Sequence, residues 1–199
     1  MFPAVTSSSP IVFAITGASG APYALRLLEV LASEHIPTWL LVSVHGWRLL
    51  AEECGIKDPD GLTQATGGDW GCVRLFDDKD RGAQPASGSV LTRGMVVCPC
   101  SMGTMAAIAH GTSRSLIERA ADVTLKERRP LVLVPRETPL SLVHLRNMTA
   151  ATEAGAVVLP AAPGFYQRPQ HVSELVDFIV QRIVDQFGLG VQIMKRWQG

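Results

Sequence analysis

The sequence predicts an α/β fold, a single-domain, doubly wound parallel sheet with helices on both faces. Short uncharged apolar segments at 11–16, 95–99, 131–135 and 157–163 stop abruptly at small, hydroxyl-bearing or charged residues. The stretches between them have the three- and four-residue apolar spacing of amphipathic helices. Strands that alternate with helices in this way form parallel sheets buried on both faces. A length of 199 residues suits one such domain.

The first half of the chain contains three predicted strands. The strand at 11–16 runs into a Gly-rich turn, and Pro22 suits the first turn of the helix 22–33 that follows. Leucines three residues apart line one face of this helix. The other elements expected here are a strand at 38–43, a helix at 47–54, a loop or broken helix at 55–72 and a strand at 73–76.

The second half begins with a polar segment rich in Asp, Gly and Pro at 77–88, which predicts a surface loop. For a helix at 140–154 the expected C-cap is Gly155, and for a helix at 173–187 the expected N-cap is Ser173. The other expected elements are a strand at 95–99, helices at 102–109 and 113–128, a strand at 131–135 and a strand at 156–159.

Charge and composition narrow the class of protein. Lys and Arg total 18 and Asp and Glu total 18, so the basic footprint of a nucleic-acid-binding protein is absent. Hydrophobic residues make up 47% of the chain, which favours both a sheet buried on two faces and a homo-oligomer with a covered surface. The four cysteines form no CxxC pair and the five histidines no HxH or HxxH pair. We therefore expect reduced thiols, a cytoplasmic protein and no metal site.

The ends of the chain lie outside the strand–helix pattern. Residues 1–10 are small and polar with two prolines, and predict a flexible N-terminal arm. They lack the features of a signal peptide, and no segment approaches the about 18 apolar residues of a membrane span. We expect the αβα domain to cover 11–190 and a C-terminal tail to cover 191–199.

Residues that could bind a ligand follow several of the strands. The turn 17–20, the segment 100–104 and the Arg136–Glu137 pair each come directly after a strand, and Ser43 ends one. Carboxyl ends of parallel strands share one edge, where amides at helix starts and an arginine attract anions. The sequence predicts an anion pocket there, although tight turns, helix caps and a solvated ion pair are the local alternatives. The turn matches neither GxGxxG nor GxSxG, so a dinucleotide fingerprint and a hydrolase serine are not supported.

Other polar residues permit two interpretations each. Arg119 and Lys126 share a helix face and either border a buried site or form a surface ion-pair stripe with Asp122. Glu137 could donate a proton if its environment raises its pKa. Local sequence places Glu53 on a solvated face. Tyr166 either covers a pocket or has a plain packing role.

Short motifs spread along the chain together resemble a known family. They are TGASGA at 16–21, PASGS at 85–89, CPCSMGT at 98–104, RAADV at 119–123, LKERR at 125–129, RE at 136–137, PLS at 139–141, HL at 144–145 and the segment 160–166. In combination they resemble the UbiX flavin prenyltransferases over roughly residues 11–197. The chain departs from that pattern at Val44-His45, where many relatives have a lysine, at Ser115, where they have asparagine, and at Arg81-Gly82.

The resemblance implies a flavodoxin-like or Rossmann-like three-layer αβα fold that binds flavin. It implies a metal-independent enzyme that joins the dimethylallyl group of dimethylallyl monophosphate to N5 and C6 of reduced FMN. The product, prenylated FMN, is the cofactor of UbiD-type decarboxylases, including one in ubiquinone synthesis. The family forms dodecamers with sites at subunit junctions, so the tail 191–199 is expected at a subunit interface.

The resemblance also assigns roles by position. The residues expected to bind FMN are Gly17, Ala18, Ser19, Ser43, Ser101, Met102, Gly103, Thr104 and Arg136. Those expected around the prenyl phosphate and prenyl group are Arg119, Lys126, Arg136, Tyr166, Arg182 and Trp197. Those expected to be catalytic are Ser19, which assists proton movement, Glu53, Lys126 and Glu137, the acid that helps phosphate leave.

Two other functions stay open. FMN-dependent cysteine decarboxylases of the same superfamily carry PASANT where this chain has PASGS, and no histidine suited to their chemistry is obvious near the first helix. A non-catalytic flavin-binding accessory subunit would leave the expected phosphate-binding cations without a purpose. Flavodoxin-type carriers are also strongly acidic, whereas this chain is neutral.

Overall fold

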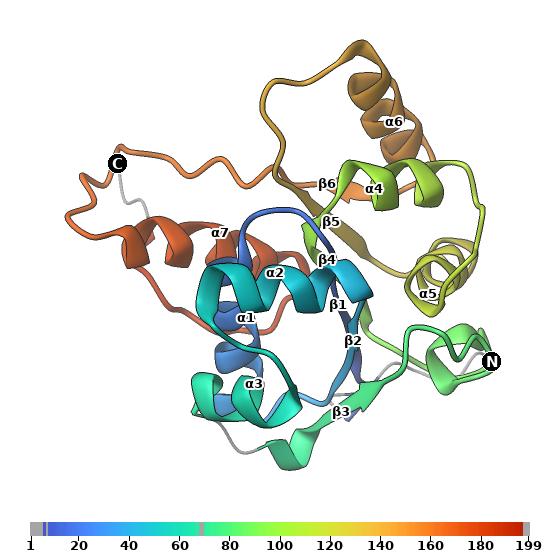
Figure 1. Ribbon diagram of the computed structural model, residues 1–199, viewed down its shortest axis with the longest axis horizontal. Coiled ribbons are helices and arrows are strands. Elements are labelled where there is room, and N and C mark those ends of the chain that lie inside the picture. The colour runs from blue at the N-terminus through green and yellow to red at the C-terminus, as the bar shows by residue number, and fades with distance from the viewer. Residues whose placement is uncertain (1–5, 7, 68–69, 197–199) are drawn as a thin grey trace.

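The computed structural model describes residues 6, 8–67 and 70–196 and contains one parallel β-sheet between two layers of helices (Figure 1). The sheet order is β3-β2-β1-β4-β5-β6. The strands are β1 (Ile11–Ile15), β2 (Thr38–Val42), β3 (Val73–Phe76), β4 (Gly94–Cys100), β5 (Leu131–Pro135) and β6 (Val157–Val158). The predicted doubly wound parallel sheet is therefore confirmed.

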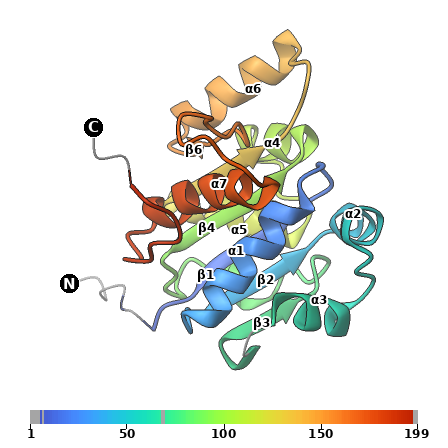
Figure 2. The same cartoon turned by 90° about the vertical axis from the view of Figure 1, so that its left-hand side faces the viewer.

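Helices cover both faces of this sheet, as Figures 1 and 2 show. One layer holds α1, α2, α3 and α7, and the other holds α4, α5 and α6. Their bounds are α1 (Ala21–Ser33), α2 (Val44–Cys54), α3 (Pro59–Thr66), α4 (Met102–Ala109), α5 (Leu116–Lys126), α6 (Leu142–Glu153) and α7 (Val172–Gln186). None of the described helices is long and apolar enough to cross a membrane.

The central strand β1 shows why the strand sequences are apolar throughout. Successive side chains of a strand point to opposite faces. Phe13 therefore packs beneath α1 and α7, whereas Val12 and Ala14 pack beneath α4 and α5. All five residues of the strand are buried. Both faces of the sheet are covered, so polar side chains are confined to the strand ends, and this confinement positions the site.

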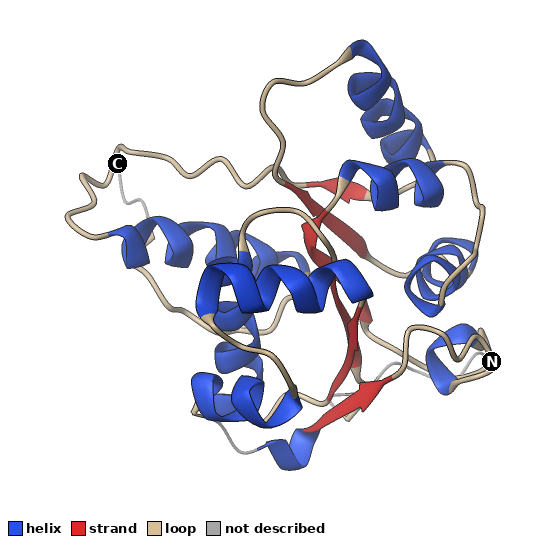
Figure 3. Ribbon diagram, viewed as in Figure 1, coloured by secondary structure: helices blue, strands red, loops and turns tan. Residues whose placement is uncertain are grey.

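Several predicted boundaries were wrong because capping side chains decide where helices begin. The helix expected at 47–54 starts at Val44, since Ser43 accepts a hydrogen bond from the Gly46 amide at 3.0 Å. The helix expected at 113–128 starts at Leu116, with Ser115 as its N-cap. The segment 55–72 contains helix α3 and a 3₁₀ turn (Figure 3).

The predicted caps in the C-terminal third were also wrong. Helix α7 starts at Val172, so Ser173 lies inside it, and His171 occupies the N-cap position without a side-chain capping bond. Helix α6 ends one residue earlier than predicted, so its C-cap is Ala154 and Gly155 follows with a φ of 106°.

Candidate active site at the carboxyl edge of the sheet

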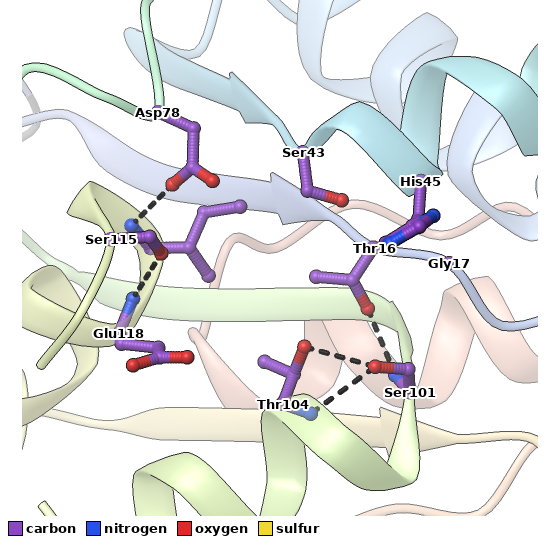
Figure 4. Close-up of a pocket in the computed structure, with 10 residues that line it drawn as sticks. Thr16, Gly17, Ser43, His45, Asp78, Ser101, Thr104, Ser115 and Glu118 are labelled. Atoms are coloured by element: carbon purple, nitrogen blue, oxygen red, sulfur yellow. Dashed lines mark hydrogen bonds between the residues drawn. The ribbon is translucent and has the colours of Figure 1, made fainter. Parts of the chain in front are cut away.

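A cavity of about 220 Å³ lies at the carboxyl ends of β1 to β4 (Figure 4). The strand order reverses between β1 and β4, and open α/β sheets bind ligands at such a switch point. The lining is mostly hydroxyl-bearing and acidic, and consists of Thr16, Gly17, Ser43, His45, Asp78, Ser101, Thr104, Ser115, Ile117 and Glu118. A cavity is therefore present on the edge where the sequence predicts an anion pocket.

Thr16 connects the two strands on either side of the switch point. Its hydroxyl donates to the carbonyl oxygen of Pro99 at 2.8 Å. It also accepts from the amide of Ser101 at 2.8 Å (Figure 4). The side chain is only 2% exposed, so water does not compete for these bonds. Thr16 thereby sets the distance between the first turn and the start of α4.

The start of α4 contributes two hydroxyls and backbone amides. The Ser101 side chain accepts from the Thr104 amide at 3.2 Å and lies 3.0 Å from the Thr104 hydroxyl. Met102 contributes only its backbone here, because its side chain is buried among the core residues below the sheet. Positive partial charge at the N-terminus of a helix favours an anion at this point.

The first turn lies directly against α2. A Cβ atom on Gly17 would lie 2.5 Å from the Cβ of His45, so only glycine permits this approach. His45 lines the cavity, at one of the positions where the sequence departs from the family pattern. Ser43, which caps α2, lines it as well.

Glu53 reaches from α2 to the start of α1. Its Oε2 atom accepts from the amides of Gly20 at 3.0 Å and Ala21 at 2.8 Å. Partial burial of Glu53 acts to raise its pKa. Hydrogen bonds from the Ser19 side chain and these two amides, together with the charge of Arg136, outweigh that effect and lower the pKa below its ordinary value. Glu53 is exposed, as local sequence predicted, but its carboxylate is bonded to the start of α1, which local sequence did not predict.

The same geometry corrects part of the anion-pocket prediction. The amides of Gly20 and Ala21 are satisfied by a protein carboxylate, so they are not donors for a ligand. The α4 start and Arg136 stay available as anion-binding elements. Arg136 follows β5, and its Nε atom donates to the carbonyl oxygen of Ser19 at 3.0 Å. Ser19, Glu53 and Arg136 thus meet beside the cavity, although three different elements supply them.

Glu137 is exposed next to this cluster. Its Oε1 atom accepts from the amide of Thr138 at 3.1 Å. This local bond orients the carboxylate at the end of β5 and leaves its second oxygen toward solvent. The structure therefore places the predicted acid on the correct edge of the sheet.

The cations expected around the prenyl phosphate are not gathered within one chain. Lys126 ends α5 before β5 begins and forms an ion pair with Glu127, whereas Arg136 follows the end of β5. The five residues of this strand, roughly 16 Å long, lie between the two. Arg119 is paired with Asp122 at 2.7 Å, on the α5 face that contains Lys126.

The remaining residues of the expected prenyl site lie on and near α7. Arg182 contacts Asp185 at 3.4 Å, and the ring of Tyr166 packs edge-on against Phe178 with centroids 5.9 Å apart. Trp197 lies outside the described residues. No contact among the described residues brings Arg119, Lys126 and Arg182 to Arg136 within the chain.

Comparisons with known proteins identify the family. Residues 4–184 match the Flavoprotein family. The chain is 49% identical over 194 residues to flavin prenyltransferase UbiX of Pseudomonas aeruginosa, covering 94% of this chain and 93% of that protein. The chain belongs to the UbiX flavin prenyltransferase family. The resemblance inferred from the motifs is confirmed, and with it an enzyme of the prenyltransferase class.

Solved structures of UbiX-type proteins share the complete fold. AnUbiX (PadA1), in complex with FMN and dimethylallyl pyrophosphate, superposes with a TM-score of 0.87 and 40% identity, covering 96% of this chain and 98% of its own. A dodecameric FMN-dependent UbiX-like decarboxylase from Escherichia coli O157:H7 superposes with a TM-score of 0.85 and 39% identity, covering 96% and 100%. The flavodoxin-like three-layer fold implied by the motifs is thus confirmed.

Two polar residues that support the site of this flavin prenyltransferase family member, Thr16 and Asp78, were not predicted from the sequence. Thr16 was treated only as the end of a strand, although a hydroxyl at the end of a buried strand is itself a signal of a polar contact. Asp78 was placed in a surface loop, yet its backbone oxygen accepts from Leu116 and its Oδ1 accepts from Ile117, each at 2.8 Å. Asp78 thereby ties the loop after β3 to the start of α5. Among the described residues, no three His, Cys, Asp or Glu side chains gather as a metal site.

Proposed function

We propose that this chain transfers the dimethylallyl group of dimethylallyl monophosphate to N5 and C6 of reduced FMN, without a metal, and releases phosphate and prenylated FMN. The observation that carries this proposal is the meeting of Ser19, Glu53 and Arg136 at the same turn whose Gly17 lines the cavity. A carboxylate bonded to a hydroxyl, with a guanidinium held on the same turn, can move a proton and hold an anion in the same small volume.

The residues around the cavity fit FMN. Hydroxyls and helix-start amides suit a phosphate and the polar edge of a flavin ring. Of the groups that would hold it, Gly17, Ser43, Ser101 and Thr104 line the cavity. The others belong to the same two helix starts or bond to them, and are Ala18, Ser19, Met102, Gly103 and Arg136. Bound reduced FMN supplies the electron-rich ring atoms to which the prenyl group is attached.

Proton movement falls to Ser19 and Glu53. The lowered pKa keeps the Glu53 carboxylate ionised near neutral pH, so it can accept a proton through the Ser19 hydroxyl. Hydrogen bonds from the α1 amides hold the carboxylate in one orientation. Glu137, the residue that follows Arg136, would donate a proton to the departing phosphate.

Cationic side chains would stabilise the phosphate as its negative charge grows. Arg136 would act from the same chain as the flavin, and Arg119, Lys126 and Arg182 would act from neighbouring copies, together with the hydroxyl of Tyr166. Trp197 would pack against the prenyl group. Because Lys126 and Arg136 lie at opposite ends of β5, we propose that the site is assembled at subunit junctions.

Exposed apolar side chains support such an assembly. On α6, Leu142 is 61% exposed, Val143 62% and Leu145 47%, and only Asn147 and Ala151 of that helix are buried. A helix that leaves this much apolar surface uncovered is suited to contact another subunit. We propose a dodecamer, an arm at 1–10, a flavin-binding domain at 11–190, and a tail at 191–199 that reaches a subunit interface.

The biological setting is part of the proposal. A cytoplasmic enzyme would pass prenylated FMN to a UbiD-type decarboxylase. Mass spectrometry of the flavin, before and after anaerobic incubation of the purified protein with reduced FMN and dimethylallyl monophosphate, tests the transferase activity. The expected result is a flavin heavier by one dimethylallyl group. Bound flavin of unchanged mass would reject the transferase and favour the accessory-subunit alternative.

A further inference from the structure

Helix α7 holds a buried glutamine that fastens the end of the chain. Gln181 is only 3% exposed. Its Nε2 atom donates to the carbonyl oxygen of Val191 at 3.0 Å, and its Oε1 accepts from the amide of Ile193 at 2.8 Å. Leaving the polar atoms of a buried amide group unpaired costs free energy. These two bonds therefore favour a single path for the chain at 191–193.

The described end of the chain is held at two further points along that path. The side-chain amide of Gln167 donates to the carbonyl oxygen of Lys195 at 2.9 Å. Arg196 reaches Asp185 on α7 with its Nη2 atom 2.8 Å from Oδ1. The segment 189–196, which follows α7 in the chain, thus lies against that helix. It places Arg196 next to the part of α7 that contains Arg182.

Asp185 connects the two arginines. Its Oδ2 atom accepts from Nη1 of Arg182 at 3.4 Å and from Nη1 of Arg196 at 3.4 Å. Gln181 donates to its Oδ1 at 3.0 Å. One carboxylate therefore holds two guanidinium groups side by side, where without it their like charges would repel.

The exposure of the three side chains shows which part of this cluster faces outward. The Asp185 side chain is 18% exposed, whereas the side chains of Arg182 and Arg196 are 55% and 57% exposed. The carboxylate lies beneath the guanidiniums, which keep further N–H donors directed outward. The net charge of the trio is positive, and paired guanidinium donors match a phosphate group.

We infer that Arg196 is a further phosphate-binding guanidinium for the prenyl donor, and that Asp185 is the positioning residue that presents it together with Arg182. This inference rests on the proposed function, which already assigns Arg182 to the phosphate. Gln181 has a supporting role, because it fixes the chain path that carries Arg196 to Asp185.

Steady-state kinetics of the full-length protein test the inference, with prenylated flavin as the product measured. Arg196→Ala should raise KM for dimethylallyl monophosphate about tenfold or more, since a hydrogen bond to a charged group is lost. The Kd for FMN, from flavin fluorescence, should stay within twofold. Arg196→Lys keeps the charge without the planar fork and should recover part of the loss. Arg48→Ala removes an exposed arginine that pairs with Glu52 on α2, so it is the matched control and should leave both constants unchanged.

Asp185→Asn separates positioning from a merely structural role. It should raise KM for the donor with kcat changed less than twofold, because the guanidiniums lose their shared counter-charge while the fold is retained. Equal loss in kcat, donor KM and FMN affinity would overturn the positioning role. An unchanged donor KM in Arg196→Ala would overturn the inference while the transferase activity of the wild type stands. Absence of any product with the wild-type protein would instead reject the proposed function.

Discussion

The carboxylate of Glu53 caps the helix that begins at Ala21, with its Oε2 atom 2.8 Å from the Ala21 amide. The residue at the N-cap position, Gly20, has no side chain to do this. A residue on α2 therefore completes α1, and the start of the first helix cannot form its full set of bonds until the two helices pack. The same carboxylate lies next to Ser19, so one contact serves both stability and the proposed proton transfer.

Removing the Glu53 charge should separate these two contributions. Glu53→Gln keeps an oxygen that can accept the α1 amides but cannot accept a proton, so turnover should fall by about a hundredfold. Glu53→Ala removes the cap as well and should lower the free energy of unfolding by about 1–2 kcal/mol. Turnover and urea unfolding of both variants check this. Full turnover in Glu53→Gln would contradict the proton role.

The lowered pKa of Glu53 predicts how this contribution depends on pH. The unfolded chain binds the proton near pH 4.5, and the folded chain binds it only at lower pH. The stabilisation is therefore complete above the unfolded pKa and is lost as pH falls through the folded pKa. The gap in unfolding free energy between wild type and Glu53→Gln should be constant near neutral pH and close below about pH 4.5. Glu52→Gln, the same change on an exposed neighbour, is the control, and a gap that widened in acid would contradict the prediction.

We expect Thr16 to support stability and FMN binding through its hydroxyl and not through the shape of its side chain. Thr16→Val fills the same volume but leaves the Ser101 amide without its acceptor, which should cost about 1–3 kcal/mol of stability and weaken FMN binding. Thr16→Ser keeps the hydroxyl and should retain FMN affinity within a few-fold. Thermal unfolding and flavin fluorescence titration measure the two effects. Equal FMN affinity in the valine variant would show that the link between β1 and β4 is unimportant for the site.

Glu137 should affect chemistry and not flavin binding. Glu137→Gln preserves the acceptor for the Thr138 amide, so the end of β5 should keep its conformation. Turnover should fall at least tenfold while the Kd for FMN changes less than twofold, because only the proton for the departing phosphate is removed. Single-turnover formation of prenylated flavin measures the chemical step, and an unchanged rate would remove the proposed acid role.

Much of the fold is encoded in local patterns. The strands β1, β4 and β5 are apolar throughout because both faces of the sheet are covered, and a short apolar segment shows this without any long-range information. The residues after these strands could also be assigned to the ligand edge, because the carboxyl ends of parallel strands lie at one edge of the sheet. The predicted helix starts were less accurate. A serine such as Ser43 can be a helix N-cap or an ordinary loop residue, and the local pattern does not distinguish the two.

The sequence by itself determined the strand–helix alternation, the family and the edge of the sheet that carries the site. Only the tertiary structure decided that Glu53 meets Gly20, 33 positions away, and that Thr16 bonds Ser101, 85 positions away. It also decided that Lys126 and Arg136 lie at opposite ends of β5. Periodicity depends on neighbouring residues and is visible in the sequence. A hydrogen bond between distant segments depends on how helices and strands pack, which no local pattern records.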